Sequence, residues 1–308
     1  MSGVAILCSG QGAQHRDMFA LTGTAPAAEP VFAAAAAHLG GVDPRQFVRD
    51  AGDDALFANQ AGQVLCCTQA IAAWSALRPP ASMIAGYSVG ELAAWCCAGM
   101  LDPAQTLALA SQRARLMDEA AAAGPRAGLL AIIGLRRDRI EMLLRETGCA
   151  LAIVNGPDNV VAGGPDRALD VLAGQARAAG AGRVVRLRVA VAAHTPLLAG
   201  ASGRFRQALL DTSPHTPSHA LLSGIDGDRV RSVEAGCDRL SRQIAQTIDW
   251  SACLAHCHEA GAVAMLELGP GRVLARMATA ALPGSEARAL DDFRSIDGVR
   301  DWLRRAAG

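Results

Sequence analysis

The chain has 308 residues, of which 51% are hydrophobic and 19% are charged, so it is long enough to bury a full core in one large domain or in one domain with a smaller insert. Arginine and lysine together number 29, as do aspartate and glutamate, and this balance provides no overall field that would attract nucleic acid or an anionic membrane. Every one of these cations is arginine, which excludes P-loop and Schiff-base chemistry, because both need a lysine.

Short apolar runs alternate with longer segments of helical periodicity over the first 123 residues. The pattern predicts strands at 4–8 and 83–87 and helices at 63–77, from about 89, and at 103–122. Asp102 is the expected N-cap of the last helix, with Pro103 at its first position. This alternation is typical of an α/β fold with a largely parallel sheet.

The order of elements changes at residue 124. Strands are predicted at 127–135, 150–155, 159–164 and 183–189, and helices at 137–147 and 167–179. The resulting β-α-β-β-α-β order is that of a ferredoxin-like unit. We therefore expect an α/β domain over 1–123 and 189–308, with a ferredoxin-like α+β subdomain inserted at 124–188.

The α/β pattern resumes after this insert. Helices are expected at 196–210 and 233–246, a strand at 263–268, and a further helix after residue 271.

The nine cysteines show no spacing that requires disulfides or a metal. Two adjacent pairs, 66–67 and 96–97, lie in apolar helical patterns and are interpreted as reduced, buried thiols of a cytosolic protein. Cysteines and histidines also gather at 253–258, but no second ligand pair follows at zinc-finger spacing, so a helix face is favoured and no metal is predicted.

No targeting or membrane-spanning segment is evident. The apolar run at the N-terminus is too short for a signal sequence, and no stretch approaches the ~20 apolar residues of a membrane span. We expect a cytoplasmic protein without a membrane or nucleic-acid partner.

A serine lies between two glycines in the segment AGYSVGELAAW at 85–95, where a strand gives way to a helix. G-x-S-x-G in this context is the pattern of a nucleophile elbow, in which the glycines permit a tight turn that exposes the hydroxyl. The pattern predicts Ser88 as a nucleophile, and it offers the backbone N–H of Val89 to a developing oxyanion. An ordinary buried turn serine is the alternative.

A serine nucleophile needs a base, and seven histidines are available. His194 stands out because it follows the last predicted strand of the insert and precedes a predicted helix, at a junction where clefts form. A core or helix-capping histidine is the alternative. In α/β-hydrolases an acid lies between serine and histidine in the chain, but no acid lies in a suitable loop here, so a later group is expected to orient the base.

The segment CSGQGAQ at 8–14 forms a glycine-rich turn after the first predicted strand. A dinucleotide fingerprint would require glycine where His15 stands, so that function is excluded. The turn can instead present the backbone N–H of Gln11 as a second oxyanion donor.

Several motifs in order resemble those of the malonyl-CoA:acyl-carrier-protein transacylases: SGQGAQ, GYSVGE, QRARLMDEA, AIIGL, VNGPDNVVAGG, VAAHTPLL and ELGPGRVL. The resemblance covers nearly the whole chain, and it implies a hydrolase-like doubly wound α/β domain with a ferredoxin-like insert. The implied roles are an acylated nucleophile (Ser88), its base (His194), oxyanion amides (Gln11 and Val89), a guanidinium that grips the malonyl carboxylate (Arg113), a backbone carbonyl that orients the histidine (Asp249), and positions near the pocket (Asn155 and Gln63).

The resemblance also implies the substrates. Malonyl-CoA would be the donor and the thiol of an acyl carrier protein the acceptor, with no bound cofactor and no metal. A guanidinium binds a carboxylate through two parallel hydrogen bonds, which a monocarboxylic acyl group does not offer. Without its motif, Arg113 would be interpreted as a solvated helix charge.

Two departures bear on the type of transacylase. Tyr87 stands where the family usually has histidine, and Ala193 stands where serine or phenylalanine is frequent, which leaves a roomier wall and weakens the expected selectivity against methylmalonyl groups. GYSVGE together with VAAH looks most like the epsilon subunit of bacterial malonate decarboxylase. In that enzyme, the carrier subunit that would accept the malonyl group bears a phosphoribosyl-dephospho-CoA arm.

Alternatives remain at this point. They are a fatty-acid-synthesis transacylase, a serine thioesterase or esterase, and a docking subunit that retains the fold alone. The insert carries a set of arginines that either receives an acidic carrier protein or forms a solvated surface. These arginines are at positions 136, 137, 139, 183, 186 and 188.

Overall fold

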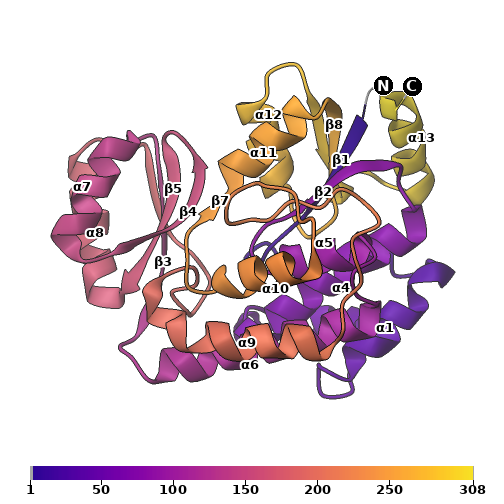
Figure 1. Cartoon of the computed structure of the whole chain (residues 1–308), viewed down its shortest axis with the longest axis horizontal. Coiled ribbons are helices and arrows are strands. Elements are labelled where there is room, and N and C mark those ends of the chain that lie inside the picture. Colours follow the sequence, from indigo (N-terminus) through magenta and orange to yellow (C-terminus); the bar gives the residue numbers. More distant parts are fainter. Residues whose placement is uncertain (1–2, 308) are drawn as a thin grey trace.

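A four-stranded parallel sheet lies in the larger part of the structure, a computed structural model that describes residues 3–307. The strands are β1 (Gly3–Cys8), β2 (Ala81–Gly86), β8 (Ala262–Glu267) and β9 (Glu286–Ala289), in the spatial order β2-β1-β8-β9 (Figure 1). Successive side chains of β1 from Val4 to Cys8 are all buried, so both faces of this strand are covered. Because β1 and β2 are parallel, with Cys8 paired to Gly86, the loops that follow them begin at the same edge of the sheet.

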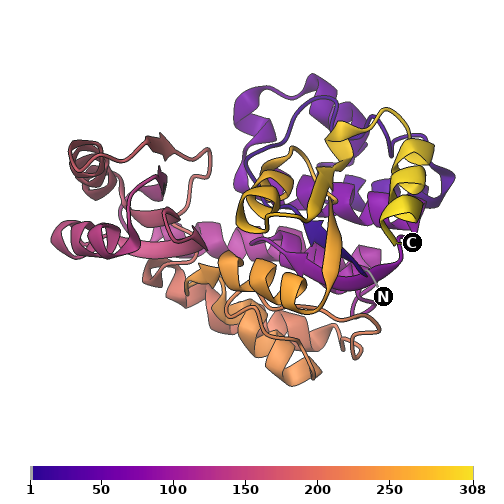
Figure 2. The ribbon, with the colours of Figure 1, turned by 90° about the horizontal axis from the view of Figure 1, so that it is seen from above.

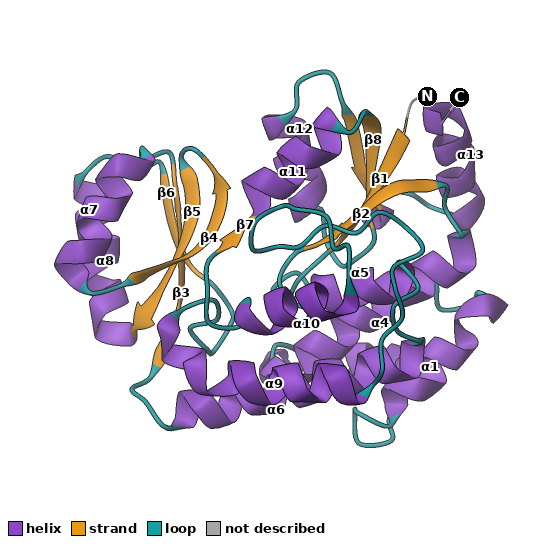
Figure 3. Cartoon of the chain, in the orientation of Figure 1, coloured by secondary structure: helices purple, strands orange, loops and turns teal. Residues whose placement is uncertain are grey.

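Helices pack around this sheet (Figure 3). They are α1 (Glu29–Ala36), α2 (Pro44–Asp50), α3 (Asp53–Leu56), α4 (Asn59–Leu77), α5 (Gly90–Cys97), α6 (Pro103–Ala122), α9 (Ala199–Asp211), α10 (Val233–Arg242), α11 (Trp250–Glu259), α12 (Val273–Ala281) and α13 (Ile296–Ala307), with short 3-10 turns at Pro26–Ala28, Pro196–Leu198 and Leu290–Asp292. α4 buries almost every side chain along its length, so it is a core helix without a solvent-facing stripe.

A second sheet has the order β6-β3-β5-β4-β7. Its elements are β3 (Ala127–Ile133), α7 (Arg137–Thr147), β4 (Ala150–Gly156), β5 (Asn159–Pro165), α8 (Asp166–Ala178), β6 (Arg183–Arg186) and β7 (Ile248–Asp249). The first four strands pair antiparallel, and a small core of their own packs them against α7 and α8. Figure 2 shows this unit projecting from the rest of the chain.

The fold class predicted from the sequence is confirmed, including the β-α-β-β-α-β order of the smaller unit. We propose residues 124–188 as an inserted subdomain, to which β7 from the C-terminal part adds a short strand parallel to β4. The capping of α6 is also as predicted, because Asp102 accepts from Gln105 in a reciprocal capping box.

Two predicted elements end three or more residues early, and one of these differences shapes the site. β6 ends at Arg186 instead of 189, and α10 ends at Arg242 instead of 246. Beyond Arg242 the N–H groups of Ile244 and Ala245 close tighter turns, three residues back along the chain. The helix therefore ends with carbonyl groups that need partners from elsewhere in the fold.

Within residues 3–307, no helix combines the length and the hydropathy that crossing a membrane requires. The expected cytoplasmic location stays a prediction.

Candidate active site

The turn between β2 and α5 is built by close backbone contact. A Cβ on Gly86 would lie 2.3 Å from the backbone of Glu91, and one on Gly90 would lie 2.1 Å from the carbonyl oxygen of Cys8, so only glycine fits at either position. Between them, Ser88 has a φ of 56°, the left-handed conformation that non-glycine residues rarely adopt. The strained turn lifts the serine hydroxyl at the N-terminus of α5.

Ser88 and His194 converge although 106 positions separate them in the sequence. The distance between Ser88 Oγ and His194 Nε2 is 2.8 Å. On the other side of the ring, His194 Nδ1 lies 2.6 Å from the backbone carbonyl oxygen of Gln243, and the His194 backbone N–H donates to Ile244 at 2.8 Å. Two carbonyls that follow the end of α10 therefore hold His194 in place, one through the imidazole and one through the backbone N–H.

This geometry fixes the protonation of the histidine. A carbonyl oxygen only accepts, so Nδ1 carries the proton and Nε2 is free to take a proton from Ser88. Burial, together with the positive charge of Arg113, lowers the pKa of His194 from 6.5 to about 3, although the hydrogen bond to Gln243 opposes the shift. The imidazole is therefore neutral at pH 7, which is the form that a general base requires.

The prediction that the Asp249 carbonyl orients the histidine is wrong, because Gln243 supplies that carbonyl. Asp249 instead begins α11, where its side chain accepts from the backbone N–H of Ala252 at 3.0 Å. It also belongs to β7, the short strand that pairs with β4 at the edge of the second sheet. Asp249 therefore caps the start of a helix and lies at the edge of a sheet.

Arg113 is fully buried on the inner face of α6 and is not a solvated helix charge. Its Nη1 donates to Gln63 Oε1 at 2.8 Å and its Nη2 to Gln243 Oε1 at 3.2 Å. Its Nε–H has no hydrogen-bond partner among the residues that the structure describes. Burial lowers the pKa of Arg113 to about 10, so the guanidinium stays charged at neutral pH, with N–H donors left for an anion.

A chain of amides connects Arg113 with the glycine-rich turn. Gln63 Nε2 donates to Asn59 Oδ1 at 2.9 Å, and the backbone carbonyl of Asn59 accepts from Gln11 Nε2 at 3.1 Å. The predicted positions 63 and 11 therefore lie on the same side of the site as Arg113.

The two predicted oxyanion donors flank the serine. Val89 directly follows Ser88 at the N-cap of α5, and a Cβ on Gly10, next to Gln11, would lie 3.5 Å from Ser88 Cβ. Neither the Val89 nor the Gln11 backbone N–H donates a hydrogen bond within residues 3–307. Both groups therefore remain available to a charged oxygen.

A cavity of about 260 Å³ adjoins the serine turn between the second sheet and α12. Gln11, Tyr87 and Asn155 form its polar side, and aliphatic side chains form most of the rest. The Tyr87 hydroxyl donates to Asn155 Oδ1 at 3.1 Å, and Asn155 Nδ2 donates to Asn159 at 3.3 Å. A larger hollow of about 720 Å³ beside α13 contains none of the predicted site residues.

The cysteine and histidine cluster at 253–258 lies on α11. Cys253 and Cys257 are buried, and all nine cysteines of the chain are free thiols. In the part of the chain that the structure describes, no group of three or more histidine, cysteine, aspartate or glutamate side chains could hold a metal ion.

The arginines of the smaller unit are partly neutralised. Arg136 and Arg137 pair with acids on α7, Arg186 pairs with Asp166, and Arg188 pairs with Asp53. The net positive field of this surface is therefore weaker than the sequence alone implies.

Gln243 and Glu91 belong to the site but were not identified from the sequence. Gln243 was hidden because the helical pattern continues past it to 246, and no sequence signal marks a carbonyl that a helix leaves free. Glu91 is part of the GYSVGE motif, and its position three residues after the serine is the signal that could have indicated it.

The sequence profile of the acyl transferase domain family matches residues 6–290. A malonyl CoA-acyl carrier protein transacylase of Mycobacterium tuberculosis is 34% identical over 215 residues, which are 70% of this chain and 70% of the relative. The protein of the same name from Escherichia coli is 28% identical over 301 residues, which are 95% of this chain and 97% of the relative.

A similar solved structure is a malonyl-transacylase in complex with its type II PKS acyl-carrier protein. The match has a TM-score of 0.90 and 29% identity, and it covers 97% of this chain and 99% of that chain. The likeness therefore extends over both sheets.

Proposed function

The chain belongs to the acyl transferase domain family, and we propose that it moves a malonyl group from malonyl-CoA to the thiol of an acyl carrier protein through an ester on Ser88. One observation carries the proposal: a serine and a neutral histidine in hydrogen-bond contact lie beside a buried arginine that has unused donors. The pair supplies acyl transfer, and the arginine supplies the preference for an acyl group with a free carboxylate.

Acylation begins when Ser88 Oγ gives its proton to His194 Nε2 and attacks the thioester carbonyl carbon. The backbone N–H groups of Val89 and Gln11 stabilise the tetrahedral oxyanion. The carbon–sulfur bond then breaks, and the CoA sulfur leaves with the proton that His194 holds. The malonyl group is now an ester of Ser88.

Transfer repeats these steps with a new nucleophile. The carrier thiol gives its proton to His194 Nε2 and attacks the ester carbonyl, and Ser88 Oγ leaves with that proton. Both half-reactions use only side chains and backbone amides, so no bound cofactor is needed and the CoA thioester is the substrate.

The experiment that tests this function follows the acyl-enzyme after excess malonyl-CoA is removed. Radiolabelled malonyl-CoA should leave one label on Ser88, which should pass to a holo carrier protein within seconds and to water much more slowly. A label that decays equally fast without a thiol acceptor would favour a thioesterase or esterase instead. Absence of any label on the intact chain would favour a docking subunit.

The identity of the carrier is a finer proposal. Tyr87 and Ala193 support the malonate decarboxylase carrier only through the resemblance of GYSVGE and VAAH to its transacylase, whereas the relatives named above support an ordinary acyl carrier protein. The alternative is a fatty-acid-synthesis carrier with a phosphopantetheine arm. Parallel chases with the two carriers decide between them, since the preferred arm should accept the malonyl group at the higher kcat/KM.

Replacing Arg113 should change which acyl group is accepted. Arg113→Met keeps an unbranched, flexible side chain but removes the guanidinium and its charge, so kcat/KM for malonyl-CoA should fall by roughly 10- to 100-fold, the scale of a charge-assisted hydrogen bond. Acetyl-CoA has no carboxylate, so its kcat/KM should fall much less. Competition between the two thioesters measures the ratio, with Arg113→Lys as a control that keeps the charge. An unchanged ratio would remove the role assigned to Arg113.

A further inference from the structure

Glu91 is a buried acid that acyl transfer, as described above, does not use. It lies in the first turn of α5, three residues after Ser88, and its side chain is 1% exposed. Its Oε2 accepts two hydrogen bonds, from the backbone N–H of Gly224 at 2.9 Å and from Gln243 Nε2 at 2.5 Å. A buried carboxylate with two such partners is fixed in position.

Gln243 is the residue through which Glu91 reaches the site. Its side-chain oxygen accepts from Arg113 at 3.2 Å, and its backbone carbonyl accepts from His194 Nδ1 at 2.6 Å. One residue thus contacts both His194 and the guanidinium, and Glu91 accepts from the side-chain N–H₂ group of that residue.

We propose that Glu91 is a positioning residue for acyl transfer, which fixes the side-chain amide of Gln243 and thereby aligns Arg113 with His194. The inference rests on the proposed function, since it assigns Glu91 to the same site. It adds a residue that touches neither the substrate nor the reacting atoms.

The orientation of the Gln243 amide explains why an acceptor is needed at this place. An amide presents an oxygen on one side and an N–H₂ group on the other. Because Glu91 Oε2 accepts, the N–H₂ group of Gln243 turns towards it and the oxygen turns towards Arg113. The reverse orientation would direct the amide hydrogens at the guanidinium and leave both donor groups unpaired.

Protonation of Glu91 does not alter this arrangement. Burial raises the pKa of Glu91 to about 8, although its hydrogen bonds and the Arg113 charge oppose the shift. A proton on Oε1 leaves the lone pairs of Oε2 for Gly224 and Gln243. The N-terminus of α5 also stabilises the ionised form.

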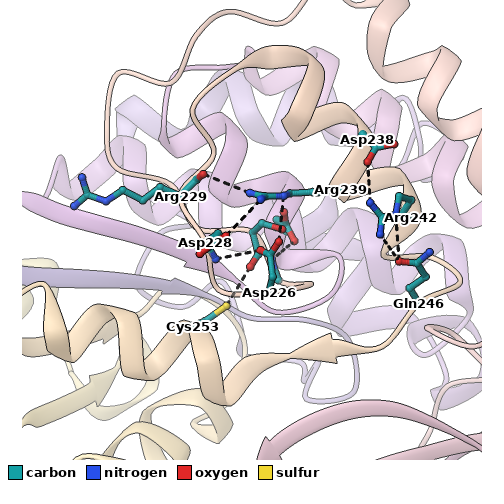
Figure 4. Close-up of polar contacts among 11 residues, drawn as sticks. Asp226, Asp228, Arg229, Asp238, Arg239, Arg242, Gln246 and Cys253 are labelled. Carbon is teal, nitrogen blue, oxygen red and sulfur yellow. Dashed lines mark hydrogen bonds and ion pairs between the residues drawn. The ribbon is translucent and has the colours of Figure 1, made fainter.

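The loop that supplies Gly224 is itself fastened to α10, the helix that Gln243 directly follows (Figure 4). Arg239 of α10 pairs with Asp226 at 3.1 Å and with Asp228 at 3.5 Å. Cys253 of α11 donates to the carbonyl of Ser223 at 3.4 Å. The two donors to Glu91, Gly224 and Gln243, are therefore held by segments that are tied to each other. A positioning residue requires such rigid partners.

The test compares Glu91→Gln with Glu91→Met, which have similar size. Gly224 and Gln243 both donate to Oε2 of Glu91. A glutamine at position 91 would therefore turn its amide oxygen towards these donors and keep both hydrogen bonds. Methionine offers no such acceptor. We expect Glu91→Met to lower kcat/KM for malonyl-CoA by roughly 10- to 100-fold and to reduce the preference for malonyl over acetyl thioesters, whereas Glu91→Gln should stay within a few-fold of the wild type.

A purely structural role would lower the rates of both thioesters equally and leave their ratio unchanged, and that result would overturn the proposal. If Glu91→Met does not fold, Glu91→Asp takes its place, because it keeps the acceptor but withdraws it by one methylene. The malonyl-to-acetyl ratio of Glu91→Asp should also fall, and a wild-type ratio would contradict the inference.

A double-mutant cycle tests whether Glu91 acts through Gln243. Gln243→Met keeps the backbone carbonyl for His194 but removes the amide, so adding Glu91→Met should cause little further loss of the malonyl-to-acetyl ratio. Losses that multiply would show that Glu91 acts by another route. Failure of the wild-type enzyme to form a malonyl ester would instead refute the proposed function, so the two failures are distinguishable.

Discussion

Ser88→Ala is expected to abolish covalent labelling by malonyl-CoA and to lower transfer to a carrier protein by roughly 10⁴- to 10⁶-fold, the scale of losing a serine nucleophile. The reason is geometric, because Ser88 Oγ lies 2.8 Å from His194 Nε2. The buried thiols near the turn do not replace it, since burial raises the pKa of Cys66 and Cys67 well above the ordinary thiol value. Mass spectrometry of the intact protein after incubation with malonyl-CoA measures the label.

A matched variant separates chemistry from folding. Ser88 has a φ of 56°, which glycine adopts freely and alanine does not, so Ser88→Gly should be more stable than Ser88→Ala by about 1 kcal/mol while remaining equally inactive. Thermal unfolding of both variants checks the order. A label that persists on Ser88→Ala would place the nucleophile at another residue.

Elements with local start and stop signals could be predicted from the sequence. α6 begins at Pro103, directly after its N-cap Asp102, and α7 is followed by Gly148 in the left-handed conformation; the observed bounds of both helices match the predicted ones. The end of α10 could not be predicted, because the apolar pattern continues while the free carbonyls are taken up by His194 from a distant part of the chain. Local periodicity does not record such a long-range partner.

The same distinction applies to the candidate site. Ser88 and His194 could be predicted because a serine and a histidine are the side chains that nucleophilic acyl transfer needs. Each also lies at a junction between a predicted strand and a predicted helix. The group that orients the histidine is a backbone carbonyl, and every residue has one. The family resemblance therefore pointed to the carbonyl of Asp249, whereas the structure uses that of Gln243. Glu91 was missed for another reason, since its importance depends on the contacts of Gln243.

In the proposed function, the nucleophile alone does not define which acyl group is accepted. Glu91 lies three residues after Ser88, yet the hydrogen bonds that connect it with Arg113 run through Gln243, which is 130 positions further along the sequence than Arg113. Under the proposed roles of Arg113 and His194, acyl selection and orientation of the base both depend on Gln243, and changes at Gln243 should affect both.

Removal of the base should produce the second large loss. His194→Gln is close in size but does not act as a general base, so acylation of Ser88 should slow by roughly 10²- to 10⁴-fold. Single-turnover labelling with malonyl-CoA measures this rate. The double variant Ser88→Ala/His194→Gln should be no less active than Ser88→Ala alone, because the two side chains act as one unit.

The wild-type pH profile should carry the signature of the same histidine. Its pKa is lowered from 6.5 to about 3, so Nε2 remains free to accept a proton as the pH falls through 6.5, and the acylation rate should not halve there. Between pH 6.5 and 3 the unfolded chain binds a proton on residue 194 that the folded chain does not, so this group lowers stability as the pH falls. His194→Gln should lose that one-proton dependence of the unfolding free energy. An acylation rate in the wild type that halves near pH 6.5 would mean that the base titrates as an exposed histidine, in conflict with its buried contact to Gln243.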